Sequence, residues 1–162
     1  MTREEFKHLF EIHFDVVRNY IYYRSGDSEL ATDIAQETFM RVWEKQLNFK
    51  ENKTKGLLFK IAGDLFISSY RKQKVMLQFK LQAKPGRTDH SPEDIMQFEE
   101  LKEKYETALA QMPEKQRIVF LMSRMDQQKN REIAETLNLS IKAVEKRMKQ
   151  ALDYVKKAIS ES

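Results

Sequence analysis

Cysteine is absent from the 162 residues of this sequence, and glycine and proline are scarce, at four and three residues. Without cysteine there are no disulfide bonds, thiolate metal ligands or cysteine nucleophiles, which is typical of proteins from a reducing compartment. Four scattered glycines cannot build a phosphate-binding loop, and so few glycines and prolines leave few positions for tight turns. We therefore expect a cytoplasmic protein built from helices.

Long apolar runs are absent as well. No segment is apolar enough to span a bilayer, and residues 1–5 (MTREE) are charged, unlike the start of a signal peptide. Apolar residues make up 41% of the chain, enough for a core, and its abundant leucine, lysine, glutamate, glutamine, methionine and alanine favour helices. The fold class that we predict is all-α: two small helical domains joined by a linker, the C-terminal one containing a helix-turn-helix.

The N-terminal part of the chain has the periodicity of three amphipathic helices. Thr2 and Glu5 form a capping box before the first, which is predicted to end near Arg24. Ser28 is predicted to cap the second, and a polar loop at residues 48–56 precedes the third. The second helix has inward positions at every third or fourth residue: Ala31, Ile34, Ala35, Thr38 and Val42.

A break in periodicity separates this part from the rest. Pro85-Gly86 lies in a polar stretch that does not favour a helix, and Ser91-Pro92 is typical of a new helix start. We place one domain at residues 1–78, a linker at residues 79–94 and a second domain at residues 95–162.

Residues 130–148 have the layout of a helix-turn-helix. In that motif a small residue lets two helices cross closely, a residue tolerant of positive φ forms the turn, and a capped second helix enters the DNA major groove. Ala134, Asn138 and Ser140 occupy these places. An ordinary helical hairpin has similar spacing, so the charge of the second helix is needed to choose between the two.

The second helix of this motif is strongly basic. Residues 140–157 hold six basic side chains against two acidic ones, a surplus of four that equals the net charge of the whole chain, +4. A basic stripe confined to one element is typical of contact with phosphates, although a solvated helix face remains the alternative.

At this point the sequence resembles a known family. Residues 112–121 (MPEKQRIVFL), 132–134 (EIA) and 140–148 (SIKAVEKRM) are similar to region four of the sigma-70 family, which binds the minus-thirty-five promoter element and the flap of RNA polymerase. Residues 33–43 (DIAQETFMRVW) resemble the region two helix that docks on the polymerase clamp. Residues 58–62 (LFKIA) and 70–72 (YRK) resemble the helix that opens and reads the minus-ten element.

Both blocks occur in family order, with no room for a third domain between them. This is the architecture of the extracytoplasmic-function (ECF) sigma factors. The resemblance implies a sigma factor that binds bacterial core RNA polymerase, double-stranded promoter DNA and its melted non-template strand. It also implies an anti-sigma factor, often membrane-bound in relatives, that transmits an extracytoplasmic signal. No cofactor, metal or small-molecule substrate is expected.

The resemblance and the helical spacing together give three sets of candidate residues. For polymerase binding, one polar helix face carries Asp33, Gln36, Glu37, Met40, Arg41 and Glu44. For minus-ten DNA, the candidates are aromatic, cationic and amide side chains suited to an extruded base: Phe49, Lys50, Asn52, Lys53, Phe66, Tyr70, Arg71 and Lys72. For minus-thirty-five DNA, the candidates for contacts with bases or phosphates are Arg131, Ser140, Lys142, Glu145, Lys146, Arg147 and Lys149.

The sequence departs from the family at the third helix. Relatives usually carry Arg-Asn after the Ile-Ala pair, whereas this chain has Gly63-Asp64. An acidic side chain beside DNA weakens binding, so either Asp64 turns away or the contact with the base differs.

Two other function classes were weighed. An enzyme would have to start from the histidines, but Glu5 and His8 form a single Glu-x-x-His pair where a di-iron bundle needs two, and no nucleophile motif is present. A repressor or activator that reads paired half-sites as a dimer is the second alternative. It would use residues 33–43 for a homodimer instead of for polymerase.

Overall fold

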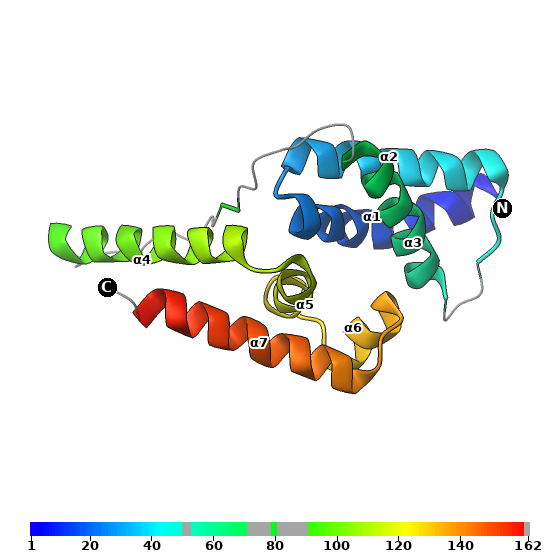
Figure 1. Ribbon diagram of the computed structural model, residues 1–162. Coiled ribbons are helices and arrows are strands. Elements are labelled where there is room, and N and C mark those ends of the chain that lie inside the picture. The colour runs from blue at the N-terminus through cyan, green and yellow to red at the C-terminus, as the bar shows by residue number, and fades with distance from the viewer. Residues whose placement is uncertain (50–52, 71–78, 81–90, 161–162) are drawn as a thin grey trace.

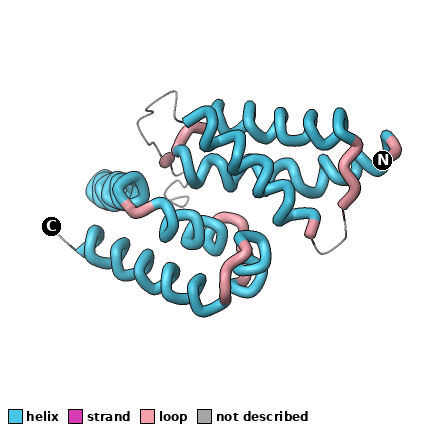
Figure 2. Tube along the Cα trace, turned by 45° about the vertical axis from the view of Figure 1, so that its right-hand side comes forward, coloured by secondary structure: helices cyan, strands magenta, loops and turns pink. Residues whose placement is uncertain are grey.

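The computed structural model describes residues 1–49, 53–70, 79–80 and 91–160, and every regular element in these ranges is a helix (Figures 1 and 2). In chain order the helices are α1 (Arg3–Ser25), α2 (Ser28–Lys45), α3 (Thr54–Tyr70), α4 (Pro92–Gln111), α5 (Glu114–Arg124), α6 (Asn130–Leu137) and α7 (Ile141–Ser160). The predicted all-helical class is confirmed. None of the helices described is both long and apolar enough to cross a membrane.

The helix starts follow the capping signals of the sequence, with one correction. The capping box of Thr2 and Glu5 begins α1, as predicted. The cap of α2, however, is Asp27 and not Ser28, because the Asp27 carboxylate accepts hydrogen bonds from the backbone nitrogens of Glu29 and Leu30, both at 3.1 Å. Ser28 is already helical. A carboxylate at this position also interacts favourably with the helix dipole.

The N-terminal domain is a bundle of α1, α2 and α3 (Figure 1). All five inward positions predicted for α2 are buried, and Phe39 is only 1% exposed, so it belongs to the core. Trp43, one turn later, is 38% exposed and packs its ring 5.1 Å from that of Phe6. The α2 helix therefore buries one face in the bundle and leaves the opposite face free.

The C-terminal domain is built around α5. Val119 and Met122 of this short helix are completely buried, and α5 packs against both α6 and α7 (Figure 1). The α4 helix begins at the capping box of Ser91 and Asp94, with Pro92 in its first turn, and packs against α7. The basic helix α7 thus has one side on the domain core.

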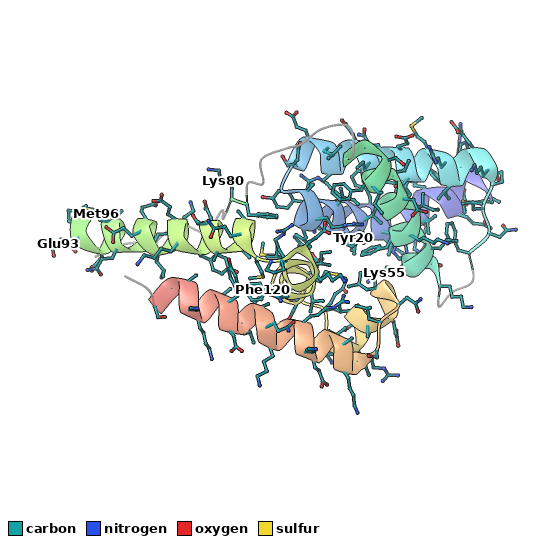
Figure 3. The ribbon with its side chains drawn as sticks, viewed as in Figure 1. Tyr20, Lys55, Lys80, Glu93, Met96 and Phe120 are labelled. Atoms are coloured by element: carbon teal, nitrogen blue, oxygen red, sulfur yellow. The ribbon has the colours of Figure 1, made fainter. Side chains whose placement is uncertain are left out.

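The two domains are in contact with each other, an arrangement that the sequence did not predict. The α5 helix packs against α1, and α6 packs against α3 (Figures 1 and 2). Figure 3 shows Tyr20 of α1 and Lys55 of α3 at this boundary. We call this packing of α5 and α6 on α1 and α3 the closed arrangement.

A histidine on α1 makes the fold sensitive to acid. His13 is half-buried, and its Nδ1 atom is buried without a hydrogen-bond partner among the residues described. Burial, and then the charges of Lys55 and His8, lower the pKa of His13 below its ordinary value of 6.5. As the pH falls, His13 is therefore protonated at a higher pH in the unfolded chain than in the folded protein. The contribution of neutral His13 to the free energy of unfolding is present above pH 6.5 and is lost as the pH falls through the lowered pKa of the folded protein.

We predict that His13→Gln reduces the loss of stability on acidification, because glutamine cannot take up the proton. The free energy of unfolding, from urea titrations at about pH 7.5 and about pH 5.5, should fall less in this variant than in the parent chain. His90→Gln, at the third histidine of the sequence, is the control. An equal fall in all three proteins would contradict this role of His13.

Candidate nucleic-acid and partner interfaces

The helix-turn-helix predicted from the sequence is present in α6 and α7. Asn138 adopts a left-handed conformation with φ of 56°, and its backbone nitrogen donates to the carbonyl of Ala134 at the end of α6. The Ser140 hydroxyl accepts a hydrogen bond of 3.1 Å from the backbone nitrogen of Ala143 in the first turn of α7. Ile133 and Val144, both fully buried, pack the two helices together.

The outer face of α7 points away from the rest of the molecule (Figure 3). Most of the predicted minus-thirty-five residues are exposed: Arg131, Ser140, Lys142, Glu145, Lys146 and Lys149. Arg147 is half-buried. Arg131 lies 3.7 Å from Glu135, but both side chains are largely exposed, so this pair contributes little to stability. The structure therefore presents a basic helix face of the size and shape that enters a major groove.

The outer face of α2 carries the predicted polymerase-binding set. All six side chains are exposed and line one shallow depression: Asp33, Gln36, Glu37, Met40, Arg41 and Glu44. Met40 is 58% exposed, and Arg41 pairs with Glu37 at 3.4 Å. An exposed methionine surrounded by mainly acidic side chains is an adaptable apolar contact with a polar rim, which suits a protein partner.

The predicted minus-ten set is only partly described. Phe49 is half-buried and Lys53 is exposed, before the start of α3. Outside the described residues lie Lys50, Asn52, Arg71, Lys72 and the side chain of Tyr70. Phe66, which was predicted to contact minus-ten DNA, is only 3% exposed in this arrangement, and an arginine from α1 covers its ring.

That arginine is Arg24, a residue which the sequence analysis did not select. Its guanidinium lies 4.7 Å from the centre of the Phe66 ring and 5.6 Å from the centre of the Tyr20 ring. It donates to the Tyr20 hydroxyl at 3.3 Å and, through Nε, to the Glu114 carboxylate of α5 at 3.2 Å. A Cβ atom at Gly63 would lie 3.2 Å from Nη1 of Arg24. The glycine that departs from the family pattern thus leaves room for this guanidinium.

Asp64, the other departure, is exposed on α3. It lies on the opposite side of the helix from the buried contacts, so its charge is available to whatever approaches α3. The sequence feature that could have indicated the contact of Arg24 with α3 is Gly63 itself, because a glycine within a helix often marks a close approach by another group.

Arg117 of α5 is the largest side chain that is almost completely buried, at 2% exposed. Its guanidinium donates to the carbonyls of Tyr23 at 2.7 Å and Arg24 at 2.9 Å, in the last turn of α1. It also donates to the carbonyls of Met112 at 2.9 Å and Leu109 at 3.3 Å, at the end of α4. Carbonyls at helix ends lack helical partners and carry partial negative charge, so one arginine caps two helices from different domains.

A second polar contact between the domains centres on Asp126. Its carboxylate accepts hydrogen bonds from the Tyr23 hydroxyl at 2.8 Å and from the Asn19 amide at 3.1 Å. Burial raises the pKa of Asp126, while these two hydrogen bonds oppose the rise. Burial, together with the neighbouring carboxylate, raises the pKa of the Tyr23 hydroxyl, so this group stays protonated as a donor.

No group of three or more histidine, aspartate or glutamate side chains that could hold a metal ion occurs among the residues described. The polar groups identified above serve caps, domain contacts or exposed helix faces. The exposed positions define three candidate surfaces: the outer face of α7, the outer face of α2, and the segment around Phe49 with α3.

Comparison with protein families gives two matches along the chain. Residues 9–75 match the model of Sigma-70 region 2, and residues 102–154 match the model of Sigma-70, region 4. The first match begins within α1 and includes α2 and α3, and the second runs from within α4 to within α7 and includes α5 and α6. Both agree with the regions to which the motifs were assigned.

Curated relatives show the same likeness over nearly the whole chain. The chain is 27% identical to the ECF RNA polymerase sigma factor SigW of Bacillus subtilis, over 97% of this chain and 90% of SigW. It is 28% identical to the ECF RNA polymerase sigma factor SigE of Mycolicibacterium smegmatis, over 93% of this chain and 61% of SigE. It is 25% identical to the RNA polymerase sigma factor YlaC of Bacillus subtilis, over 99% and 95% of the two chains.

One solved structure shares the fold over 98% of this chain and 99% of its own, with a TM-score of 0.68 and 19% identity. It is the sigma factor RpoE in complex with the anti-sigma factor NepR from Bartonella quintana.

Proposed function

The chain belongs to the ECF group of the sigma-70 family, and we propose that it binds core RNA polymerase and directs promoter-specific transcription initiation. The observation that carries this proposal is the presence of both regions, in family order, on one chain. A regulator that only binds DNA needs the helix-turn-helix but has no use for region 2.

We assign the three candidate surfaces as follows. The exposed α2 face docks on core polymerase, with Met40 as its apolar centre. The outer face of α7 enters the major groove of the minus-thirty-five element, with Lys146 and Lys149 at its centre. The segment around Phe49 and the α3 helix contact the melted non-template strand of the minus-ten element.

Polymerase binding and DNA reading support each other in this mechanism. Two weak DNA-reading domains on one chain gain affinity from their effective concentration, and the polymerase fixes the distance between them. The protein therefore works as a subunit of the enzyme and carries out no chemistry of its own. Its place of work is the cytoplasm, where the polymerase and the DNA are.

Control by an anti-sigma factor is part of the proposal. The solved structure with the same fold holds such a factor, which supports this form of regulation. An extracytoplasmic signal would then release the sigma factor from its inhibitor.

The test is transcription by purified core polymerase on a library of genomic promoters, with and without this protein, with start sites mapped by sequencing. We expect start sites that share an upstream and a downstream element at fixed spacing. DNA binding without stimulation of the polymerase would instead support the dimeric regulator. In that case sedimentation of the free protein should show a dimer.

A further inference from the structure

The α3 helix has an outer face whose residues the sequence analysis did not select as DNA contacts. Four exposed residues, spaced by three or four positions, lie on one side of the helix: Leu57, Lys60, Asp64 and Ile67. The other sides of α3 pack on α1, α2 and α6, and Phe66 is buried. We call the four exposed residues the α3 stripe.

The α3 stripe continues the surface that we assign to the minus-ten element. Lys53, one of the predicted contacts with this element, is exposed four residues before Leu57. The Leu57 backbone nitrogen donates to the Lys53 carbonyl at 3.0 Å, so the two residues are one helical turn apart. The stripe therefore extends from Lys53 along the free face of α3.

The stripe combines groups that suit phosphates with groups that suit bases. Lys53 and Lys60 are exposed cations that can pair with phosphates. Leu57 and Ile67, which are 37% and 42% exposed, offer apolar contacts to bases. Asp64 also suits a base, because its carboxylate repels phosphates. A DNA strand that follows the stripe therefore brings a base edge to Asp64.

An ion pair that stabilises the helix explains Asp64 less well. Lys60 lies four residues before Asp64, and a cation that precedes an acid is the less favourable order for such a pair. Both side chains are exposed, so a pair between them would contribute little to stability. The Asp64 carboxylate is therefore available to accept hydrogen bonds from a ligand.

A carboxylate distinguishes two classes of base. It only accepts hydrogen bonds, so it needs a donor on the base. Cytosine and adenine present an amino group, N4 or N6, at the position where thymine and guanine present a carbonyl oxygen. The amino group donates to a carboxylate, whereas the carbonyl oxygen repels it. Asparagine, which relatives usually carry at this position, both donates and accepts, so it can bind either class.

On the basis of the proposed function, we propose that Asp64 is a specificity residue for the minus-ten element. Its carboxylate accepts a hydrogen bond from the amino group of a cytosine or adenine in the non-template strand, and it disfavours guanine and thymine at that position. Lys60, one turn earlier on the same face, offsets the repulsion between the carboxylate and the neighbouring phosphates.

The first test measures base preference. Promoters randomised across the minus-ten element are transcribed by core polymerase with the parent chain or a variant, and the transcripts are sequenced. At one position the parent should favour cytosine or adenine over guanine or thymine by about tenfold, as expected for a hydrogen bond to a charged group. Asp64→Asn should reduce this preference to about twofold or less. Asp64→Lys, whose side chain only donates, should reverse it.

The matched control makes the same substitutions away from the stripe. Asp15 is exposed on α1, so Asp15→Asn and Asp15→Lys change the net charge equally and should keep the base preference of the parent. If Asp64→Asn raises transcription from all promoters alike and leaves the base preference unchanged, Asp64 acts through its charge alone and the base contact is wrong.

The second test removes only the amino group of the base. In a promoter fork with a single-stranded minus-ten region, the preferred cytosine is replaced by pyrimidin-2-one, or the preferred adenine by purine. The parent chain, assembled with core polymerase, should bind this fork about tenfold more weakly, and Asp64→Asn should lose much less. Equal losses in the two proteins would overturn the contact while leaving the proposed function intact. If the parent directs no transcription from any promoter, the proposed function fails and the role of Asp64 fails with it.

Discussion

Reversing two charges on α7, by Lys146→Glu with Lys149→Glu, is expected to abolish recognition of the upstream promoter element. Both side chains are exposed on the outer face of the recognition helix. A single contact of this kind contributes about 1–3 kcal/mol, and reversal adds repulsion from the phosphates, so a loss of a hundredfold or more in affinity is expected. The measurement is binding of the protein, assembled with core polymerase, to duplex promoter fragments.

The same variant should bind core polymerase as the parent chain does, because α2 lies in the other domain. The control is Lys7→Glu with Lys104→Glu, which changes the net charge equally at exposed positions on α1 and α4. A comparable loss of DNA binding in the control would mean that only the overall charge matters. Loss of polymerase binding in the α7 variant would contradict the assignment of functions to the domains.

The substitution Met40→Glu is expected to reduce binding to core polymerase by about tenfold or more, since apolar centres of an interface carry much of its binding energy. Met40 is 58% exposed, so a charge at this position leaves the core of the bundle intact. The measurement is a titration of labelled protein with core polymerase, followed by transcription from the strongest promoter found in the library. Both activities should fall together.

The control for Met40→Glu is a second change from an apolar to an acidic side chain in the same domain. Ile12 on α1 is 50% exposed and lies outside the α2 face, so Ile12→Glu should leave polymerase binding close to that of the parent. Thermal unfolding of both variants checks that the bundle is preserved. If Met40→Glu binds polymerase normally and the free protein is a dimer that dissociates on this substitution, the α2 face serves self-association instead.

The features predicted from the sequence are those set by local spacing. The turn at Asn138, the cap at Ser140 and the buried stripe of α2 each depend on residues within a few positions of one another. Periodicity and capping rules describe such relationships directly. Even the cap of α2, placed one residue too late at Ser28, was missed only because two suitable capping residues adjoin.

The closed arrangement was not predicted, because it joins residues that are far apart in the sequence. Asn19 and Tyr23 meet Asp126, and Arg24 meets Glu114, across about a hundred residues. No periodicity relates such pairs. The burial of Phe66 has the same origin, because the side chain that covers it comes from another helix.

Arg117 joins the two domains and also stabilises one of them. Two of its hydrogen bonds hold the end of α4 within its own domain. Replacing Arg117 would therefore weaken the C-terminal domain as well as the contact between the domains. Glu114 and Asp126 bind side chains of α1, so substitutions there weaken the contact between the domains with little effect on the rest of the fold. We expect natural variation in the strength of this contact to accumulate at these two carboxylates, while the arginine beside them is retained.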